Sequence, residues 1–188
     1  MSVKHTDRKG RLWYLHEKLT AKGNRAFFFS MDTVGQVVEV LPEAYEVYEN
    51  PNAQVFLRKR TAPVILAEEL ALVDAALARH GEAWQYLSEV KKATITVHEA
   101  SELGGLDDLY GEFRGRRMLA DEKRMSAHYR PMMRFTLADK KTRSFTVERY
   151  CFRGRIDGWI FLDGPGALVP LVRKYVKHLG RESFFELC

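Results

Sequence analysis

The sequence is poor in cysteine, and its two cysteines, Cys151 and Cys188, exclude several classes of protein. Cys151 falls in a strand-like run and Cys188 is the last residue, so they do not form the disulfide framework of a small secreted domain. No Cys-x-x-Cys or His-Glu-x-x-His motif occurs, and the six histidines lie far apart in the sequence. We therefore expect no metal site, no cofactor and a reducing, cytoplasmic location.

Long apolar runs are also absent. No stretch approaches the roughly 18 to 20 apolar residues of a membrane-spanning helix, and the start of the chain lacks the apolar core of a signal peptide. We therefore expect a soluble protein without a membrane partner. The chain contains neither a Gly-x-Ser-x-Gly motif nor a Gly-Lys-Ser/Thr phosphate-binding loop. The missing motifs favour a protein that is not an enzyme, although they do not decide the question.

Hydrophobic periodicity predicts an α+β fold, in which hairpins form an antiparallel sheet and about three main helices pack on it. Leucines and other apolar residues recur at helical spacing, and a glycine follows, in three segments: 7–22, 67–80 and 167–179. Alternating or continuous apolar runs predict strands at 26–31 (buried on both sides), 37–41, 45–49, 54–58, 94–98, 133–137, 144–152, 159–162 and 183–187. An Asn-Pro-Asn turn joins 45–49 to 54–58 as a hairpin.

A chain of 188 residues suits one compact domain, 1–188. An acidic, glycine-rich loop at 101–113 interrupts the pattern of elements. A second arrangement therefore fits the same sequence, with two subdomains, 1–100 and 114–188, joined by this loop.

Positive charge is concentrated in one part of the chain. The net charge is +5, yet residues 1–100 carry thirteen basic and thirteen acidic residues, which cancel. Residues 101–113 carry four acidic residues and no basic ones, whereas residues 114–155 carry thirteen basic and four acidic ones, a net charge of +9. This asymmetry is the least ordinary feature of the sequence.

The basic stretch predicts a face that binds an anionic partner such as nucleic acid. Lysine and arginine neutralise phosphates, and interleaved aromatic rings (Phe113, Tyr129, Tyr150 and Phe152) are suited to stack on bases. The predicted anion-binding or nucleic-acid-binding residues are Arg114, Arg116, Arg117, Arg130, Lys140, Lys141, Arg143, Arg153 and Arg155.

Arg149 is a separate candidate. If Phe145 and Val147 face the core, strict alternation places Arg149 and Cys151 on the same face. Either a bulge shifts the phase, so that Tyr150 and Phe152 point inward, or Arg149 lines a pocket beside an anionic partner. The bulge is the favoured alternative.

The leading functional hypothesis is a non-enzymatic binding or regulatory protein that uses the basic face at 114–155. A first alternative is an enzyme or binding protein for a phosphorylated or carboxylated small molecule, with Arg149 in its pocket. A second alternative is a subunit that serves only in association, through the aromatic hairpin at 45–58. The sequence does not indicate the oligomeric state.

Overall fold

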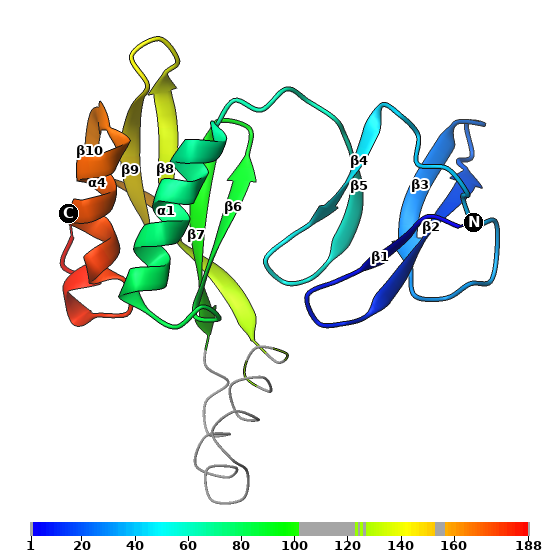
Figure 1. Cartoon of the computed structure of the whole chain (residues 1–188), viewed down its shortest axis with the longest axis horizontal. Helices are drawn as coiled ribbons and strands as arrows, with labels where there is room; N and C mark the ends of the chain where they lie inside the picture. The colour runs from blue at the N-terminus through cyan, green and yellow to red at the C-terminus, as the bar shows by residue number, and fades with distance from the viewer. Residues whose placement is uncertain (1, 102–122, 124, 126, 153–156, 188) are drawn as a thin grey trace, which may run out of the picture. The chain divides into compact units, whose positions relative to one another are not determined.

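The computed structural model describes residues 2–101, 123, 125, 127–152 and 157–187 (Figure 1). The chain divides into two compact units, the first consisting mainly of Met1–Ala62 and the second beginning at Pro63. Each unit has its own sheet or sheets. None of the helices in the described ranges is long and apolar enough to cross a membrane.

The described part of the first unit is built from strands. One antiparallel sheet has the order β1-β2-β3, and a separate hairpin pairs β4 with β5. The bounds are β1 (Lys4–Thr6), β2 (Leu12–Leu19), β3 (Arg25–Ser30), β4 (Tyr45–Glu49) and β5 (Val55–Lys59). The hairpin confirms the prediction from the Asn-Pro-Asn turn, in which Asn50 Oδ1 accepts hydrogen bonds from the backbone N–H groups of Asn52 and Gln54.

The helix predicted at 7–22 is wrong, because this segment forms the turn between β1 and β2 and the whole of β2. Asp7 begins a tight turn instead of a helix: its Oδ1 accepts the backbone N–H groups of Lys9 and Arg11, both at 2.9 Å. Gly10 has a φ of 73°, a left-handed conformation that ends any helical path. Leucines at helical spacing were therefore misleading, and Leu19 is 71% exposed.

Two further predictions for the first unit are wrong in part. The strand at 26–31 exists as β3, but it is not buried on both sides, since Phe28 is 40% exposed and stacks on His16. The strand expected at 37–41 is reduced to one isolated bridge between Val37 and His16.

The second unit contains a five-stranded antiparallel sheet with the order β10-β9-β8-β7-β6. The bounds are β6 (Tyr86–Lys91), β7 (Thr94–Ser101), β8 (His128–Asp139), β9 (Ser144–Cys151) and β10 (Gly158–Ala167). These strands confirm the sequence predictions at 94–98, 133–137, 144–152 and 159–162 and add β6, which was not predicted. β7 ends at Ser101 and β8 begins at His128, and the two strands are neighbours in this sheet. The division between the two units falls at Ala62/Pro63.

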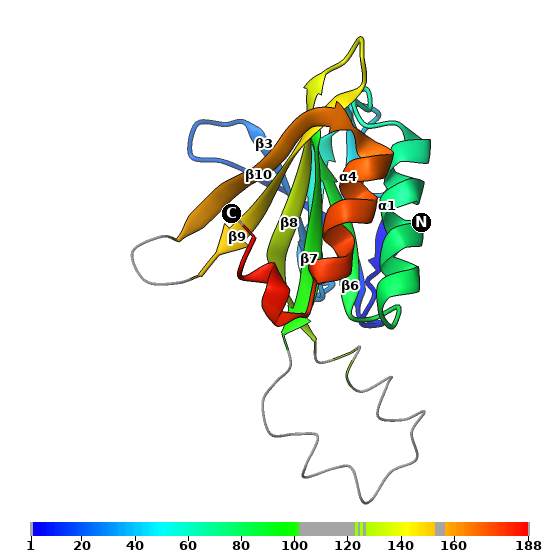
Figure 2. The same ribbon diagram turned by 90° about the vertical axis from the view of Figure 1, so that its left-hand side faces the viewer.

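Two α-helices, α1 (Ala67–His80) and α4 (Leu168–Tyr175), cover one face of this sheet (Figure 2). The core between the layers joins Val73 and Leu77 of α1, Leu171 of α4, and strand residues such as Phe135 and Phe145. Full burial of a large apolar side chain stabilises a fold by roughly 1.5 to 3 kcal/mol, so this layer is the main source of stability of the unit. The α+β class is confirmed, and the described ranges contain two full α-helices where about three were expected in the whole chain.

The C-terminal prediction is correct for the helix and wrong for the strand. After α4 the chain continues through short 3₁₀ segments, η1 (Val176–His178) and η2 (Glu182–Phe184). η2 occupies the place of the edge strand expected at 183–187. Phe184 is 1% exposed, so this segment is held by burial of its aromatic ring and does not extend the sheet.

Candidate functional site

The basic residues predicted to form one face are only partly described. Arg114, Arg116, Arg117, Arg153 and Arg155 lie outside the described residues. Arg130 lies near the start of β8, whereas Lys140 and Lys141 lie in the turn after its end. At about 3.3 Å per residue these two positions are roughly 30 Å apart along the strand. Of the four described members of this set, Lys140, Lys141 and Arg143 therefore share the turn between β8 and β9, whereas Arg130 lies far from them along β8.

Arg143 has a partner within the fold. Its Nε donates to Glu69 Oε1 at 2.8 Å, its Nη2 donates to Glu69 Oε2, and both terminal nitrogens reach the carbonyl oxygen of Val64. The hydrogen bond to Glu69 raises the pKa of Arg143 above its ordinary value. Glu69 also accepts the backbone N–H of Leu66, the N-cap residue of α1, and so satisfies one backbone donor at the start of the helix. Arg143 thus ties the β8–β9 turn to the first turn of α1.

Arg149 is buried on the core-facing side of β9, as strict alternation requires. Pairing between β8 and β9 runs without interruption from Met133 opposite Arg149 to Leu137 opposite Phe145, so the favoured bulge is wrong. The side chain of Arg149 is 7% exposed, and its Nε donates to the Leu187 carbonyl oxygen at 2.6 Å. Its Nη2 lies 3.4 Å from the Phe185 carbonyl oxygen. In the described residues, Arg149 therefore holds the C-terminal segment through backbone carbonyls.

The aromatic residues of the basic stretch are engaged with protein groups. Phe113 lies outside the described residues. Tyr129 is buried and donates its hydroxyl to the Trp84 carbonyl oxygen at 2.6 Å. The rings of Tyr150 and Phe152 lie 4.7 Å apart, and the guanidinium of Arg130 lies over Phe152 at 5.5 Å. Of these described rings, Phe152 is the one classed as exposed, at 44%.

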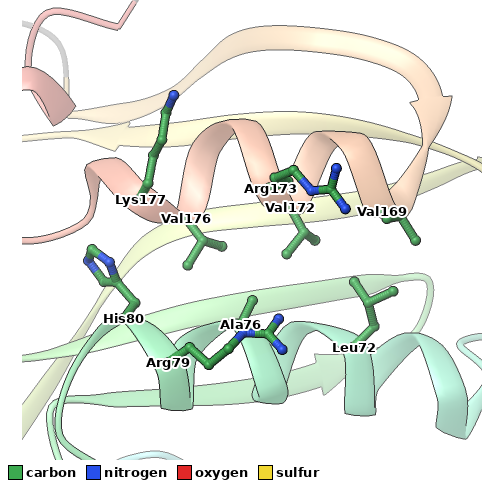
Figure 3. Close-up of a pocket in the computed structure, with 9 residues that line it drawn as sticks. All are labelled: Leu72, Ala76, Arg79, His80, Val169, Val172, Arg173, Val176 and Lys177. Carbon is green, nitrogen blue, oxygen red and sulfur yellow. The ribbon is translucent and has the colours of Figure 1, made fainter.

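A groove between α1 and α4 is a candidate site of the second unit (Figure 3). Its volume of about 340 Å³ lies near the lower end of the roughly 300 to 1,000 Å³ typical of ligand sites. Five of its lining residues are aliphatic and four are basic or histidine. They are Leu72, Ala76, Arg79 and His80 from α1, and Val169, Val172, Arg173, Val176 and Lys177 from α4 and η1.

The groove is formed by two helical segments that run side by side in the same direction. Figure 3 shows Leu72 and Val169 at one end and His80 and Lys177 at the other. From Leu72 to His80 is eight residues, which corresponds to about 12 Å along a helix. The aliphatic side chains of Ala76, Val172 and Val176 form its floor between the helices.

Cationic groups flank this floor on both sides. Arg79 belongs to α1 and Arg173 to α4, and both side chains are exposed. Among the described residues, the lining contains no aspartate or glutamate. Within the described ranges, Arg79, Arg173 and Lys177 have no hydrogen bond or ion pair through their side chains. Like charges that lack a carboxylate partner repel one another, so a bound anion would stabilise this arrangement.

Helix electrostatics give these cations a structural role as well. Arg79 and His80 lie in the last turn of α1, and Arg173 lies in the last turn of α4. A cation in the last turn of a helix contributes about 0.3 to 1 kcal/mol through the helix dipole. That role accounts for basic residues near each C-terminus, but it does not require arginines from two helices to flank one apolar floor.

One end of the groove is fixed by a hydrogen bond. His80 Nε2 donates to the Leu179 carbonyl oxygen at 2.8 Å and so connects the end of α1 to the segment after η1. The imidazole ring also packs against Tyr86, with ring centroids 5.6 Å apart. Gly180 follows with a φ of 68°, and an added Cβ would lie 2.7 Å from the Tyr86 hydroxyl oxygen. The spacing of the two helices at this end is therefore set by specific contacts.

A second groove of similar size has the opposite charge. It lies between α1 and β6, has a volume of about 300 Å³, and is lined by Asp74 and Glu82 together with apolar residues such as Leu77 and Tyr86. Asp74 Oδ1 accepts the hydroxyl of Ser88 at 2.5 Å. A groove lined by carboxylates disfavours anions. The two grooves are similar in volume, so it is the positive charge of the α1–α4 groove that makes it the candidate site for an anion.

The sequence analysis did not identify the α1–α4 groove. Its residues come from two segments, 72–80 and 169–177, whose local charge is not unusual. Comparisons with protein-family models, with curated proteins and with solved structures found no match to this chain. In the part of the chain that the structure describes, no group of three or more His, Cys, Asp or Glu side chains is placed to hold a metal ion.

Proposed function

We propose that this chain is a binding protein and that its α1–α4 groove takes up a negatively charged partner with an apolar surface. The observation that carries the proposal is the pairing of Arg79 and Arg173 across an aliphatic floor without a carboxylate in the lining. The proposal develops the predicted preference for an anionic partner but moves it from the basic stretch to the helical face.

Binding without catalysis is the function that these residues support. In the described ranges, the lining offers no serine, cysteine, aspartate or glutamate as nucleophile or general base. Among the described lining residues His80 is the one imidazole, and its Nε2 is committed to the Leu179 carbonyl. A cytoplasmic location remains our prediction, and the buried free thiol of Cys151 is compatible with it.

Nucleic acid on the basic stretch is the second candidate. It is favoured by the net charge of +9 over residues 114–155 and by the exposed ring of Phe152 beside Arg130. Against it, Arg143 and Arg149 are used within the fold, and Arg130 lies far from Lys140 along β8.

Titration with 8-anilinonaphthalene-1-sulfonate, a fluorescent probe with an apolar body and one sulfonate, tests the proposal. We expect saturable binding that weakens as salt rises, because the Debye length falls from about 10 Å at 0.1 M to about 3 Å at 1 M. The double variant R79Q/R173Q should bind about a hundredfold more weakly, since each charge-assisted contact contributes about 1.4 kcal/mol or more. The matched control K59Q/R60Q, which removes two exposed charges from the first unit, should bind like the unmodified chain.

A third double variant separates the two candidates. K140Q/K141Q removes two charges from the basic stretch and should leave probe binding unchanged. If K140Q/K141Q abolished binding and R79Q/R173Q did not, the groove would be the wrong site and the basic stretch the right one. Thermal unfolding of each variant verifies that it is folded.

A further inference from the structure

The shape of the α1–α4 groove restricts the kind of anionic partner that fits it, and this inference rests on the proposed function. The groove is open to solvent along its length: Arg79, Arg173 and Lys177 are exposed, and Val169 is 48% exposed. Small-molecule sites usually enclose 70 to 90% or more of their ligand's surface. An open groove about 12 Å long between two helices suits a longer, rod-shaped partner better.

The cations are distributed as such a partner requires. Arg79 flanks one side of the floor, and Arg173 and Lys177, four residues apart on one helical face, flank the other. The floor between them consists of Ala76 with Val172 and Val176, which are only 3% and 4% exposed, so the apolar surface open to a partner comes mainly from Leu72, Ala76 and Val169. A complementary surface therefore has a central apolar stripe with negative charges on both of its sides.

An amphipathic α-helix with acidic flanks has this surface. Its apolar residues recur at i, i+3, i+4 and i+7 and form one stripe, as in other complexes in which a helix binds a groove. Two turns of such a helix span about 11 Å, which matches the length of the groove. Glutamates beside the stripe then face Arg79 on one side and Arg173 on the other.

We infer that the α1–α4 groove binds an acidic amphipathic helix of a partner protein. The helix lies along the groove, its apolar stripe contacts the exposed Val169 and the half-buried Leu72 and Ala76, and its carboxylates pair with the two arginines. The charge pairs select acidic over basic helices, and the stripe selects helices over unstructured acidic chains.

A designed peptide tests this inference on the full chain. The probe is a labelled peptide of about four helical turns, roughly 14 residues, with leucines in one stripe and glutamates beside it. Fluorescence anisotropy measures its binding, and far-UV circular dichroism measures the helicity that it gains. Two control peptides have the same composition with the stripe shuffled, or lysine in place of each glutamate. Decanoate and anionic lipid vesicles represent other anionic partners.

The expected result is a reciprocal exchange of specificity. The acidic striped peptide should bind the unmodified chain and gain helicity, and the shuffled peptide should bind at least tenfold more weakly. R79E/R173E should bind the acidic peptide about a hundredfold more weakly, at tenfold per reversed contact, and should bind the lysine peptide more tightly than the unmodified chain does. K59E/R60E, which reverses two charges in the first unit, should behave like the unmodified chain.

Two outcomes would overturn the inference, and they differ in what they leave standing. If the shuffled peptide bound as well as the striped one, or if decanoate or vesicles bound in an arginine-dependent manner and the peptide did not, the helical partner would be wrong while the anion groove remained. If neither the peptides nor the sulfonate probe responded to R79E/R173E, the proposed function would fail as well.

Discussion

The contact between Arg143 and Glu69 makes a quantitative prediction, because it separates a structural role from the anion-binding role that the sequence suggests. The perturbation is a double-mutant cycle with Arg143→Ala, Glu69→Ala and both together. The pair is bidentate and partly buried, with side-chain exposures of 29% for Arg143 and 11% for Glu69. Exposed ion pairs contribute about 0.2 to 1 kcal/mol, whereas breaking a buried pair costs about 3 to 5 kcal/mol.

An intermediate position between these limits gives a coupling energy of about 2 kcal/mol. Arg143→Ala should therefore lower the free energy of unfolding by about 2 kcal/mol. Glu69→Ala should lower it by about 3 kcal/mol, since it also removes the acceptor for the Leu66 N–H group at the start of α1. Arg143 has a φ of 51°, a left-handed conformation whose cost arginine and alanine share, so backbone strain cancels in the comparison.

Urea denaturation measures these free energies, and the sulfonate titration of the same variants measures anion binding. The double variant should lose about 3 kcal/mol, the same as Glu69→Ala alone, because either single change already breaks the pair. Additive effects of the two single variants would show that the contact does not stabilise the fold. Unchanged stability of Arg143→Ala together with weaker anion binding would restore the anion-binding role.

Two further predictions concern buried polar groups. Arg149→Met keeps the aliphatic stem but removes both hydrogen bonds to the carbonyl oxygens of Phe185 and Leu187. It should lower the free energy of unfolding of the second unit by about 2 kcal/mol and raise the rate of amide hydrogen exchange at 182–187. A variant as stable as the parent would contradict the role of Arg149 in holding the C-terminal segment. Burial acts to raise the pKa of Asp7, but hydrogen bonds from Trp13 and Arg11 outweigh it and hold the pKa below its usual value. A carboxyl group whose pKa is lowered by folding stabilises the protein above its unfolded pKa of about 4, and that stability is lost as pH falls through the folded value. The midpoint temperature of thermal unfolding should therefore fall more steeply from pH 6 to pH 2 for the parent than for Asp7→Asn. Parallel plots of this temperature against pH would contradict the stabilising role of the Asp7 carboxylate.

Local patterns predicted the second unit well, because its elements follow the rules of their own segments. Ile95, Val97, Phe135 and Val147 alternate with polar residues, and each is fully buried in the strand that the alternation predicted. The helix at 67–80 is observed with the same bounds. In these segments the apolar residues of one period all face a single core, so the period alone fixes the structure.

The first unit shows where such patterns fail. Leu12, Leu15 and Leu19 have helical spacing, yet the segment is a strand in which Leu15 is buried and Leu19 is exposed. The turn that decides the structure is made by the carboxylate of Asp7 and the left-handed Gly10. Aspartate caps helices and also initiates turns, and the sequence does not show which of the two roles Asp7 has.

The local concentration of charge did not point to the α1–α4 groove, and neighbours along a hairpin can separate in space. The β8 and β9 strands bring some basic residues to opposite ends of the sheet and direct Arg149 into the core. Arg79 and Arg173, by contrast, are 94 positions apart in the sequence and flank one groove. A window of local net charge cannot detect a site that two distant helices form together.

A more useful signal was present in the helices themselves. Each amphipathic helix has a core-facing stripe, which includes Val73 and Leu77 on α1 and Leu168 and Leu171 on α4. Val169 lies beside the stripe of α4, and 48% of its surface remains exposed although the helix is otherwise well packed. The signal is an exposed aliphatic residue outside the core stripe, followed four residues later on the same face by an arginine. It indicates a second contact surface on the helix, separate from the face that packs on the core. In this protein that combination, Val169 with Arg173, marks the wall of the groove to which we assign the acidic helical partner.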